Sequence, residues 1–181
     1  PPDRHNARYL ELMAHPDWRF HGPGFPDREA VLEQRNRVVA RFPRVVFIGA
    51  HMASSSHDLP RLARLLEQYP NFHVDLSARI RDLGRLPYSA RRFFFRFADR
   101  ILFGTDGPPT AAQSRPYYRF LETEDEAFRQ GSRWQDSLYG IHLPDEILEK
   151  VYYRNAARIL RLESRDPGGP GARNPEQGDS V

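Results

Sequence analysis

The sequence predicts an α/β protein built on parallel strands. Three short apolar runs lie at residues 45–50, 72–77 and 100–103, and stretches with apolar residues at helical spacing separate them. Strands that alternate with helices are typical of a parallel sheet, because each crossover helix returns the chain to the same end of the sheet. A continuous apolar run is also the expected pattern for a strand that is covered on both faces.

The composition excludes several classes of protein. The chain has 181 residues with 39% hydrophobic and 28% charged, which is enough for one domain with its own core. Lys150 is the only lysine, and the 27 basic residues are scattered among 24 acidic ones, so we expect no nucleic-acid partner. The sequence has no cysteine, which excludes disulfides, thiolate metal sites and a cysteine nucleophile. No run approaches the roughly 20 apolar residues of a membrane span, and no signal peptide opens the chain. We therefore expect no membrane partner and a cytoplasmic location.

Two helices are predicted before the first strand. Residues 6–14 place apolar side chains at helical spacing, and the His15-Pro16 pair ends that pattern. Residues 17–26 form an aromatic loop rich in glycine and proline. Residues 27–42 again show helical spacing, with charged residues between the apolar ones.

The central part of the chain supplies the strands. The β-branched run at 45–50 leads directly into His51. Asp58 can cap the helix that follows, whose inward stripe is Leu59, Leu62, Leu65, Leu66 and Tyr69. The strand at 72–77 carries Asp75 near its carboxyl end, and an aromatic helix is predicted over 89–98. The third apolar run then ends in Gly104-Thr105-Asp106-Gly107.

The remainder of the chain contains one long connection, one helix and a tail. The connection over 107–143 is long and aromatic, which is typical of active-site lids and inserted elements. Pro144 opens a final helix that extends to Leu162. Residues 164–181 contain no apolar anchor and are predicted to be a disordered tail, which leaves one domain over 1–163.

The candidate site consists of His51 and Asp106, which follow the two most apolar strands. The carboxyl ends of parallel strands meet at one edge of the sheet, where α/β folds build their active sites. Histidine is a common metal ligand and proton shuttle, and aspartate supplies an anionic oxygen that can also take a proton from bound water. In the alternative interpretation, Asp106 forms a turn with Gly107 and His51 is structural. Asp75 is either a third ligand or a structural acid that pairs with Arg79.

These segments together resemble a known family. The similarity lies in Gly49-Ala50-His51, in Val74-Asp75-Leu76-Ser77-Ala78, in Ile101–Asp106 and in the closing run Val151–Leu160. This series resembles the carboxyl-terminal half of the amidohydrolase-related family, whose members are metal-dependent hydrolases and decarboxylases with a TIM-barrel fold. The match covers about residues 40–162. The resemblance implies a partial (β/α)8 barrel, made of about the last three βα units and a preceding helical segment.

The resemblance also implies roles for individual residues. Asp106 matches the aspartate that binds the metal and its water, and His51 matches a histidine that contacts the metal or polarises the substrate and the bound water. The implied cofactor is a divalent ion, zinc or manganese, and the implied substrate is a small carboxylate, lactone or aromatic acid that is hydrolysed or decarboxylated. We expect Arg79 and Trp134 to contribute to substrate binding.

The sequence departs from this family in one respect. Such barrels begin with a His-x-His strand and carry a further metal-binding histidine after strand five, and neither feature is found in a convincing form. A complete barrel also takes about 250 residues. We therefore expect a fragment of a metal-dependent enzyme that binds metal weakly or not at all by itself.

Other interpretations remain open. The main alternative is a catalytically incompetent half-barrel remnant, or a partner-dependent piece, without its own metal site. A phosphate-binding barrel half is less favoured, because no glycine-rich loop precedes a helix. A homo-oligomer is also open, since a half-barrel exposes strand edges.

Overall fold

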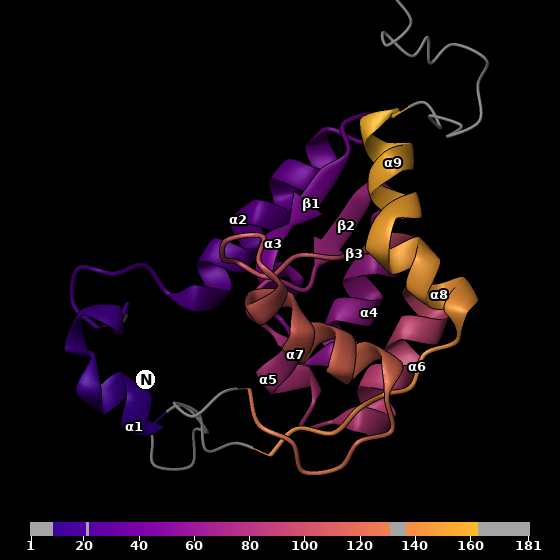
Figure 1. The fold of residues 1–181 in the computed structure, drawn as a ribbon. Coiled ribbons are helices and arrows are strands. Elements are labelled where there is room, and N and C mark those ends of the chain that lie inside the picture. Colours follow the sequence, from indigo (N-terminus) through magenta and orange to yellow (C-terminus); the bar gives the residue numbers. More distant parts are fainter. Residues whose placement is uncertain (1–8, 21, 131–136, 163–181) are drawn as a thin grey trace, which may run out of the picture. The chain divides into compact units, whose positions relative to one another are not determined.

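The computed structural model describes residues 9–20, 22–130 and 137–162. The chain divides into two compact units, residues 1–45 and residues 46–181 (Figure 1). The predicted tail at 164–181 and Trp134 lie outside the described residues. Within the described ranges, no helix is long and apolar enough to cross a membrane. The expectation of one domain over 1–163 stays a prediction.

The first unit consists of helices. They are α1 (Tyr9–Ala14), the short 3-10 helix η1 (Pro16–Trp18) and α2 (Arg28–Arg41). The Asp27 carboxylate caps α2, because it accepts hydrogen bonds from the backbone N–H groups of Glu29 and Ala30 at 3.0 and 3.2 Å. Both helices that the sequence predicts before the first strand are therefore present.

The second unit is organised around a parallel sheet of three strands in the order β1-β2-β3 (Figure 1). The strands are β1 (Phe47–Gly49), β2 (Phe72–Asp75) and β3 (Ile101–Leu102). Gly49 pairs with Val74, and Asp75 pairs with Leu102. The three predicted strands are confirmed as parallel neighbours, although each is shorter than its apolar run. Their carboxyl ends lie at one edge of the sheet.

Helices connect these strands. After β1 come α3 (Ala50–Ala53) and α4 (Leu59–Gln68), and after β2 come α5 (Ile80–Leu83), α6 (Pro87–Phe97) and the short 3-10 helix η2 (Ala98–Arg100). The Asp58 side chain accepts from the Arg61 N–H at 3.0 Å, which confirms the predicted cap. The leucine stripe of α4 is buried, and so are three phenylalanines of α6: Phe93, Phe94 and Phe97.

A helix lies within the long connection that follows β3. Helix α7 (Ala111–Glu122) begins at Thr110, whose hydroxyl accepts from the Gln113 N–H at 3.3 Å. Its buried face is formed by Tyr117, Phe120 and Leu121. The sequence pattern did not indicate this element, because Pro116 lies inside it and proline normally argues against a helix interior.

The last helical segment has three parts. It runs through α8 (Asp145–Glu149), the π-helical turn η3 (Lys150–Arg154) and α9 (Asn155–Leu160). The Val151 carbonyl accepts from the Phe103 N–H at 2.9 Å, which ties the π turn to the end of β3. The predicted final helix is present, with a π turn in its middle.

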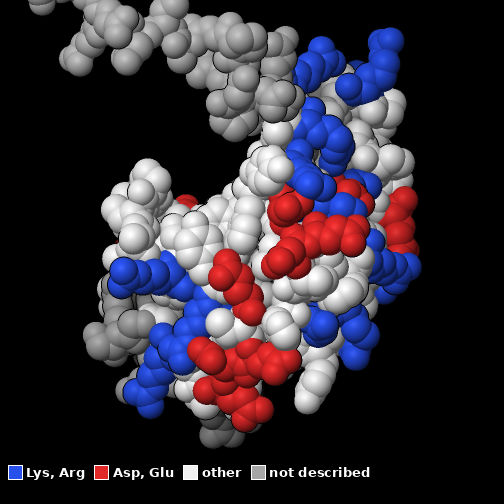
Figure 2. Space-filling model, turned by 45° about the vertical axis from the view of Figure 1, so that its right-hand side comes forward, with Lys and Arg blue, Asp and Glu red and all other residues white. Residues whose placement is uncertain are grey.

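On the face drawn in Figure 2, basic and acidic side chains occur in adjacent groups, and neither sign covers the face alone. This distribution agrees with the scattering of charge along the sequence. The expectation of no nucleic-acid partner stays a prediction.

Substituting Gly49 by alanine should destabilise the sheet. A Cβ at this position would lie 2.7 Å from Cζ of Phe72 and 2.8 Å from Cβ of Ala53. Because both contacts are too short for carbon atoms, we expect the free energy of unfolding to fall by about 1–3 kcal/mol. Urea denaturation of Gly49→Ala measures this loss. In a Phe72→Leu background the same substitution should cost less, and an equal cost in both backgrounds would contradict the proposed clash.

Candidate functional site

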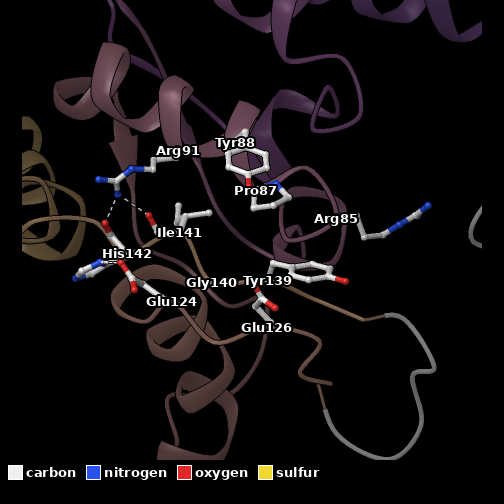
Figure 3. A pocket seen from close by; sticks show the side chains of 10 residues that line it. All are labelled: Arg85, Pro87, Tyr88, Arg91, Glu124, Glu126, Tyr139, Gly140, Ile141 and His142. Carbon is white, nitrogen blue, oxygen red and sulfur yellow. Dashed lines mark hydrogen bonds and ion pairs between the residues drawn. The ribbon is translucent and has the colours of Figure 1, made fainter.

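The surface cavities among the described residues of the second unit include two that border His142. The first has a volume of about 730 Å³ and lies between the start of α6 and the segment before α8 (Figure 3). Arg91 lines it and donates to the carbonyl oxygens of Ile141, at 2.7 Å, and His142. The second has a volume of about 690 Å³ and also borders His142, whose Nδ1 lies 2.6 Å from Glu124 Oε1. Neither cavity is lined by the residues that the sequence singles out.

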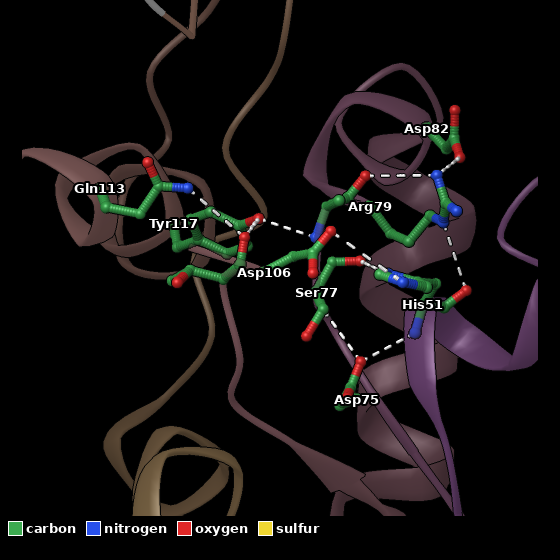
Figure 4. A network of polar contacts seen from close by, with 10 residues as sticks. His51, Asp75, Ser77, Arg79, Asp82, Asp106, Gln113 and Tyr117 are labelled. Atoms are coloured by element: carbon green, nitrogen blue, oxygen red, sulfur yellow. Dashed lines mark hydrogen bonds and ion pairs between the residues drawn. The ribbon is translucent and has the colours of Figure 1, made fainter. Parts of the chain in front are cut away.

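His51 and Asp106 lie together at the carboxyl edge of the sheet (Figure 4). His51 follows β1 and Asp106 follows β3, so they come from the two strands that flank β2. The Nε2 atom of His51 lies 4.0 Å from Oδ2 of Asp106, and the two side chains are 33% and 56% exposed. Both are therefore accessible to a small molecule, and the structure brings them together as the sequence predicts.

His51 opens a turn of unusual backbone conformation. The φ angles of His51, Met52, Ala53 and Ser54 are 58°, 53°, 50° and 55°, which places four consecutive non-glycine residues in the left-handed region. Each such residue costs roughly 1–2 kcal/mol. Strain of this kind persists only where the surrounding structure enforces it, and it concentrates at functional sites.

Hydrogen bonds from the end of β2 surround His51. The Asp75 Oδ1 atom accepts from the backbone N–H of His51 at 2.8 Å and from that of Ser77 at 3.1 Å. The Nδ1 atom of His51 lies 2.8 Å from the Ser77 carbonyl oxygen. Since a carbonyl can only accept, Nδ1 carries a proton, and in the neutral form of the ring the lone pair is on Nε2, the nitrogen nearer Asp106.

Arg79 is held beside this turn. Its Nε donates to the His51 carbonyl at 3.3 Å, and one Nη lies 4.0 Å from Oδ2 of Asp82. The ion pair of Arg79 is thus formed with Asp82, whereas the Asp75 carboxylate accepts from backbone N–H groups. The substrate-binding role of Arg79 stays a prediction, and the one assigned to Trp134 concerns a residue outside the described ranges.

Tyr117 links the segments that follow β2 and β3. Its hydroxyl accepts from the Ala78 N–H at 2.9 Å and donates to the Thr105 carbonyl at 3.0 Å. The side chain is fully buried, and burial raises the pKa of the Tyr117 hydroxyl. Sequence reasoning missed this residue, although a tyrosine within an aromatic connection after the last strand was a usable signal.

Two residues at this edge of the sheet carry groups that can bind a metal ion. A histidine nitrogen with a free lone pair and a carboxylate 4.0 Å away are both suitable ligands for a divalent ion. However, no group of three His, Cys, Asp or Glu that could hold a metal occurs among the residues that the structure describes. A catalytic zinc ion usually takes three protein ligands, so His51 and Asp106 fit such a site without completing it.

The fold and the site together define the class of protein. Parallel strands joined by helices, with a histidine and an aspartate converging at their carboxyl edge, are typical of α/β enzymes. The sequence model of the amidohydrolase family matches residues 2–162, so the chain belongs to the amidohydrolase family. The family to which the strand-end motifs pointed is thereby confirmed.

A solved structure also resembles this chain. It is the crystal structure of an uncharacterised TIM-barrel protein from Bordetella bronchiseptica, with a TM-score of 0.51 and 19% sequence identity. The similarity covers 78% of this chain and 43% of that protein, so the chain spans less than half of the neighbour's length. At this identity the likeness concerns the fold. A search of curated proteins gave no match.

Proposed function

We propose that this chain is the carboxyl-terminal part of a metal-dependent enzyme with a (β/α)8 barrel, which hydrolyses or decarboxylates a small carboxylate, lactone or aromatic acid. Family membership supports an amidohydrolase-like enzyme. The observation that carries the finer proposal is the 4.0 Å approach of His51 Nε2 to Asp106 Oδ2 at the carboxyl edge of the sheet. In this proposal β1, β2 and β3 are the last three strands of the barrel. The substrate and the metal would bind to the complete barrel of the whole protein.

In the proposed reaction, His51 and Asp106 handle protons and bind the metal. A divalent zinc or manganese ion would supply Lewis-acid activation of water or of a substrate carbonyl. The bare Nε2 of His51 can bind an ion or accept a proton. When Nε2 is protonated, the Asp106 carboxylate stabilises the charged ring, and the Ser77 carbonyl keeps Nδ1–H in place.

A second candidate function is the incompetent half-barrel, which forms no metal site of its own. It is favoured by the finding that the described residues hold no cluster of three potential ligands. This alternative and the enzyme differ in whether His51 and Asp106 cooperate in binding an ion.

Titration of the purified chain with Zn²⁺ or Mn²⁺ by calorimetry separates the two candidates. We expect weak binding that is lost in both His51→Ala and Asp106→Ala, because two ligands are fewer than a catalytic ion usually needs. His142→Ala is the matched control, since His142 also faces a carboxylate but lies away from this edge. Binding that survives both site substitutions would contradict the proposal, and no binding in any variant would favour the incompetent half-barrel.

A further inference from the structure

We propose that Asp75 is a positioning residue, which holds His51 in its left-handed turn and fixes the orientation of the His51 ring without binding metal or moving a proton. The importance of this role rests on the function proposed for His51. The hydrogen bonds that define it can be measured without metal or substrate.

The first step of the argument is the sharing of one carboxylate oxygen. Oδ1 of Asp75 accepts the backbone N–H of His51 at 2.8 Å and the backbone N–H of Ser77 at 3.1 Å. The bond to His51 joins β2 to the turn after β1, and the bond to Ser77 fixes the chain just beyond β2. One side chain therefore sets the spacing between two segments of the site.

The second step is that these bonds close a cycle around the imidazole. Ser77, whose N–H is held by Asp75, offers its carbonyl to Nδ1 of His51 at 2.8 Å. His51 is thus held at its backbone by Asp75 and at its ring by Ser77. Because the Nδ1 proton is committed to Ser77, Nε2 must face Asp106, and Asp75 acts on the ring only through the backbone (Figure 4).

The third step is the strain of the turn that begins at His51. Four consecutive non-glycine residues with φ between 50° and 58° need an external constraint, since none of them favours this region. The Asp75 bond lies at the first of these residues, where the chain changes from β1 into the left-handed turn. A single side-chain oxygen with two lone pairs can accept both N–H groups at once, which suits this task.

The fourth step concerns the surroundings of the Asp75 carboxylate. Gly104 packs directly against this region: a Cβ there would lie 2.6 Å from Oγ of Ser77 and 3.8 Å from both Cβ and Cγ of Asp75. The backbone after β3 therefore lies close against the end of β2. This close packing suits a residue that holds backbone in place.

Two substitutions separate the positioning role from a ligand or base role. Asparagine keeps the shape of aspartate and one acceptor oxygen, so Asp75→Asn retains both N–H bonds and removes only the charge. Asp75→Ala removes both bonds. A metal ligand or base would be impaired by either change.

The experiment measures the His51 tautomer and the backbone hydrogen exchange of His51 and Ser77 by ¹⁵N NMR of the whole chain in mildly alkaline buffer. In Asp75→Asn we expect the Nδ1–H tautomer and slow exchange at both amides, as in the parent protein. In Asp75→Ala we expect mixed tautomers and exchange that is faster by about tenfold or more at both amides. Asp82→Ala is the matched control, because this carboxylate bonds Ser56 and faces Arg79 but does not touch His51. We expect it to leave the His51 signals unchanged.

The outcomes are distinct. If Asp75→Asn loses the tautomer, or if Asp75→Ala keeps both the tautomer and the slow exchange, the positioning role is overturned. Should Asp75→Ala fail to fold, Asp75→Asn still shows whether the acceptor oxygen of Asp75 or its negative charge positions His51. Zn²⁺ titration of Asp75→Asn adds a readout: binding equal to that of the parent supports positioning, and a loss matching that of Asp106→Ala shows a ligand. Failure of the function proposed for His51 would leave the tautomer results intact.

Discussion

Replacing Asn155 with alanine should lower the free energy of unfolding by about 3–5 kcal/mol. The Asn155 side chain is buried, with 2% exposure, and its Nδ2 donates to the carbonyls of Ala98 at 2.7 Å and Ile101 at 2.8 Å. Truncation leaves two buried carbonyls without these donors, and each unsatisfied group costs about 1–3 kcal/mol. Because these bonds join α9 to the start of β3, their loss should weaken the packing of this strand.

Urea denaturation of Asn155→Ala and Asn155→Leu measures this loss. Leucine fills the space without donating, so a similar destabilisation in both variants assigns the effect to the hydrogen bonds and not to the cavity. Tyr153→Ala is a neighbouring control, because that side chain is 56% exposed and its loss should change the stability by less than about 0.5 kcal/mol. An Asn155→Leu variant as stable as the parent would contradict the assignment.

The second large effect is a loss of stability in acid that arises from His73. This residue lies in β2 with 4% exposure. Burial, together with the guanidinium groups of Arg100 and Arg158, lowers the pKa of His73 from 6.5 to about 4. Between these values the unfolded chain binds a proton that the folded chain does not, so stability rises with pH in this window.

The stability that His73 contributes depends on pH only between its two pKa values. The contribution of His73 is fully present above pH 6.5, is lost as the pH falls toward 4, and changes no further below that. The shift corresponds to about 3 kcal/mol of unfolding free energy.

Denaturation curves of the parent and of His73→Leu at a series of pH values isolate this contribution from that of the acidic residues. The difference in unfolding free energy between the two proteins should change by about 3 kcal/mol between pH 6.5 and pH 4. His57→Leu serves as a control, because His57 is exposed in a loop. A parent and a His73→Leu variant with parallel pH profiles would falsify the assignment to His73.

The elements that depend on local pattern could be predicted from the sequence. The leucine stripe behind Asp58 predicts α4 with its cap, since spacing and capping involve only residues a few positions apart. The convergence of His51 and Asp106 could also be predicted, because both follow apolar strands and parallel strands end at the same edge.

The rest of the site depends on contacts between distant segments. No residue of the turn His51–Ser54 is a glycine, so nothing local indicates positive φ, and the hydrogen bond to its first residue comes from Asp75, 24 positions further along the chain. For Asp75 itself the sequence suggests a ligand or a partner of Arg79, because the backbone N–H groups that it binds cannot be seen in a pattern of side chains. Helix α7 was missed for a different reason: Pro116 outweighed the spacing of its buried residues, which tertiary packing stabilises.

The double role of the Tyr117 hydroxyl sets the response of the site to alkali. The group both donates to Thr105 and accepts from Ala78, so loss of its proton would remove one bond and bury a charge beside a carbonyl oxygen. Burial raises the pKa of this phenol, so the Tyr117 hydroxyl loses its proton at a higher pH than an ordinary tyrosine does. The contact between the segments after β2 and β3 therefore persists in base. In acid the same sheet loses stability, because the unfolded chain binds a proton at His73 that the folded chain does not.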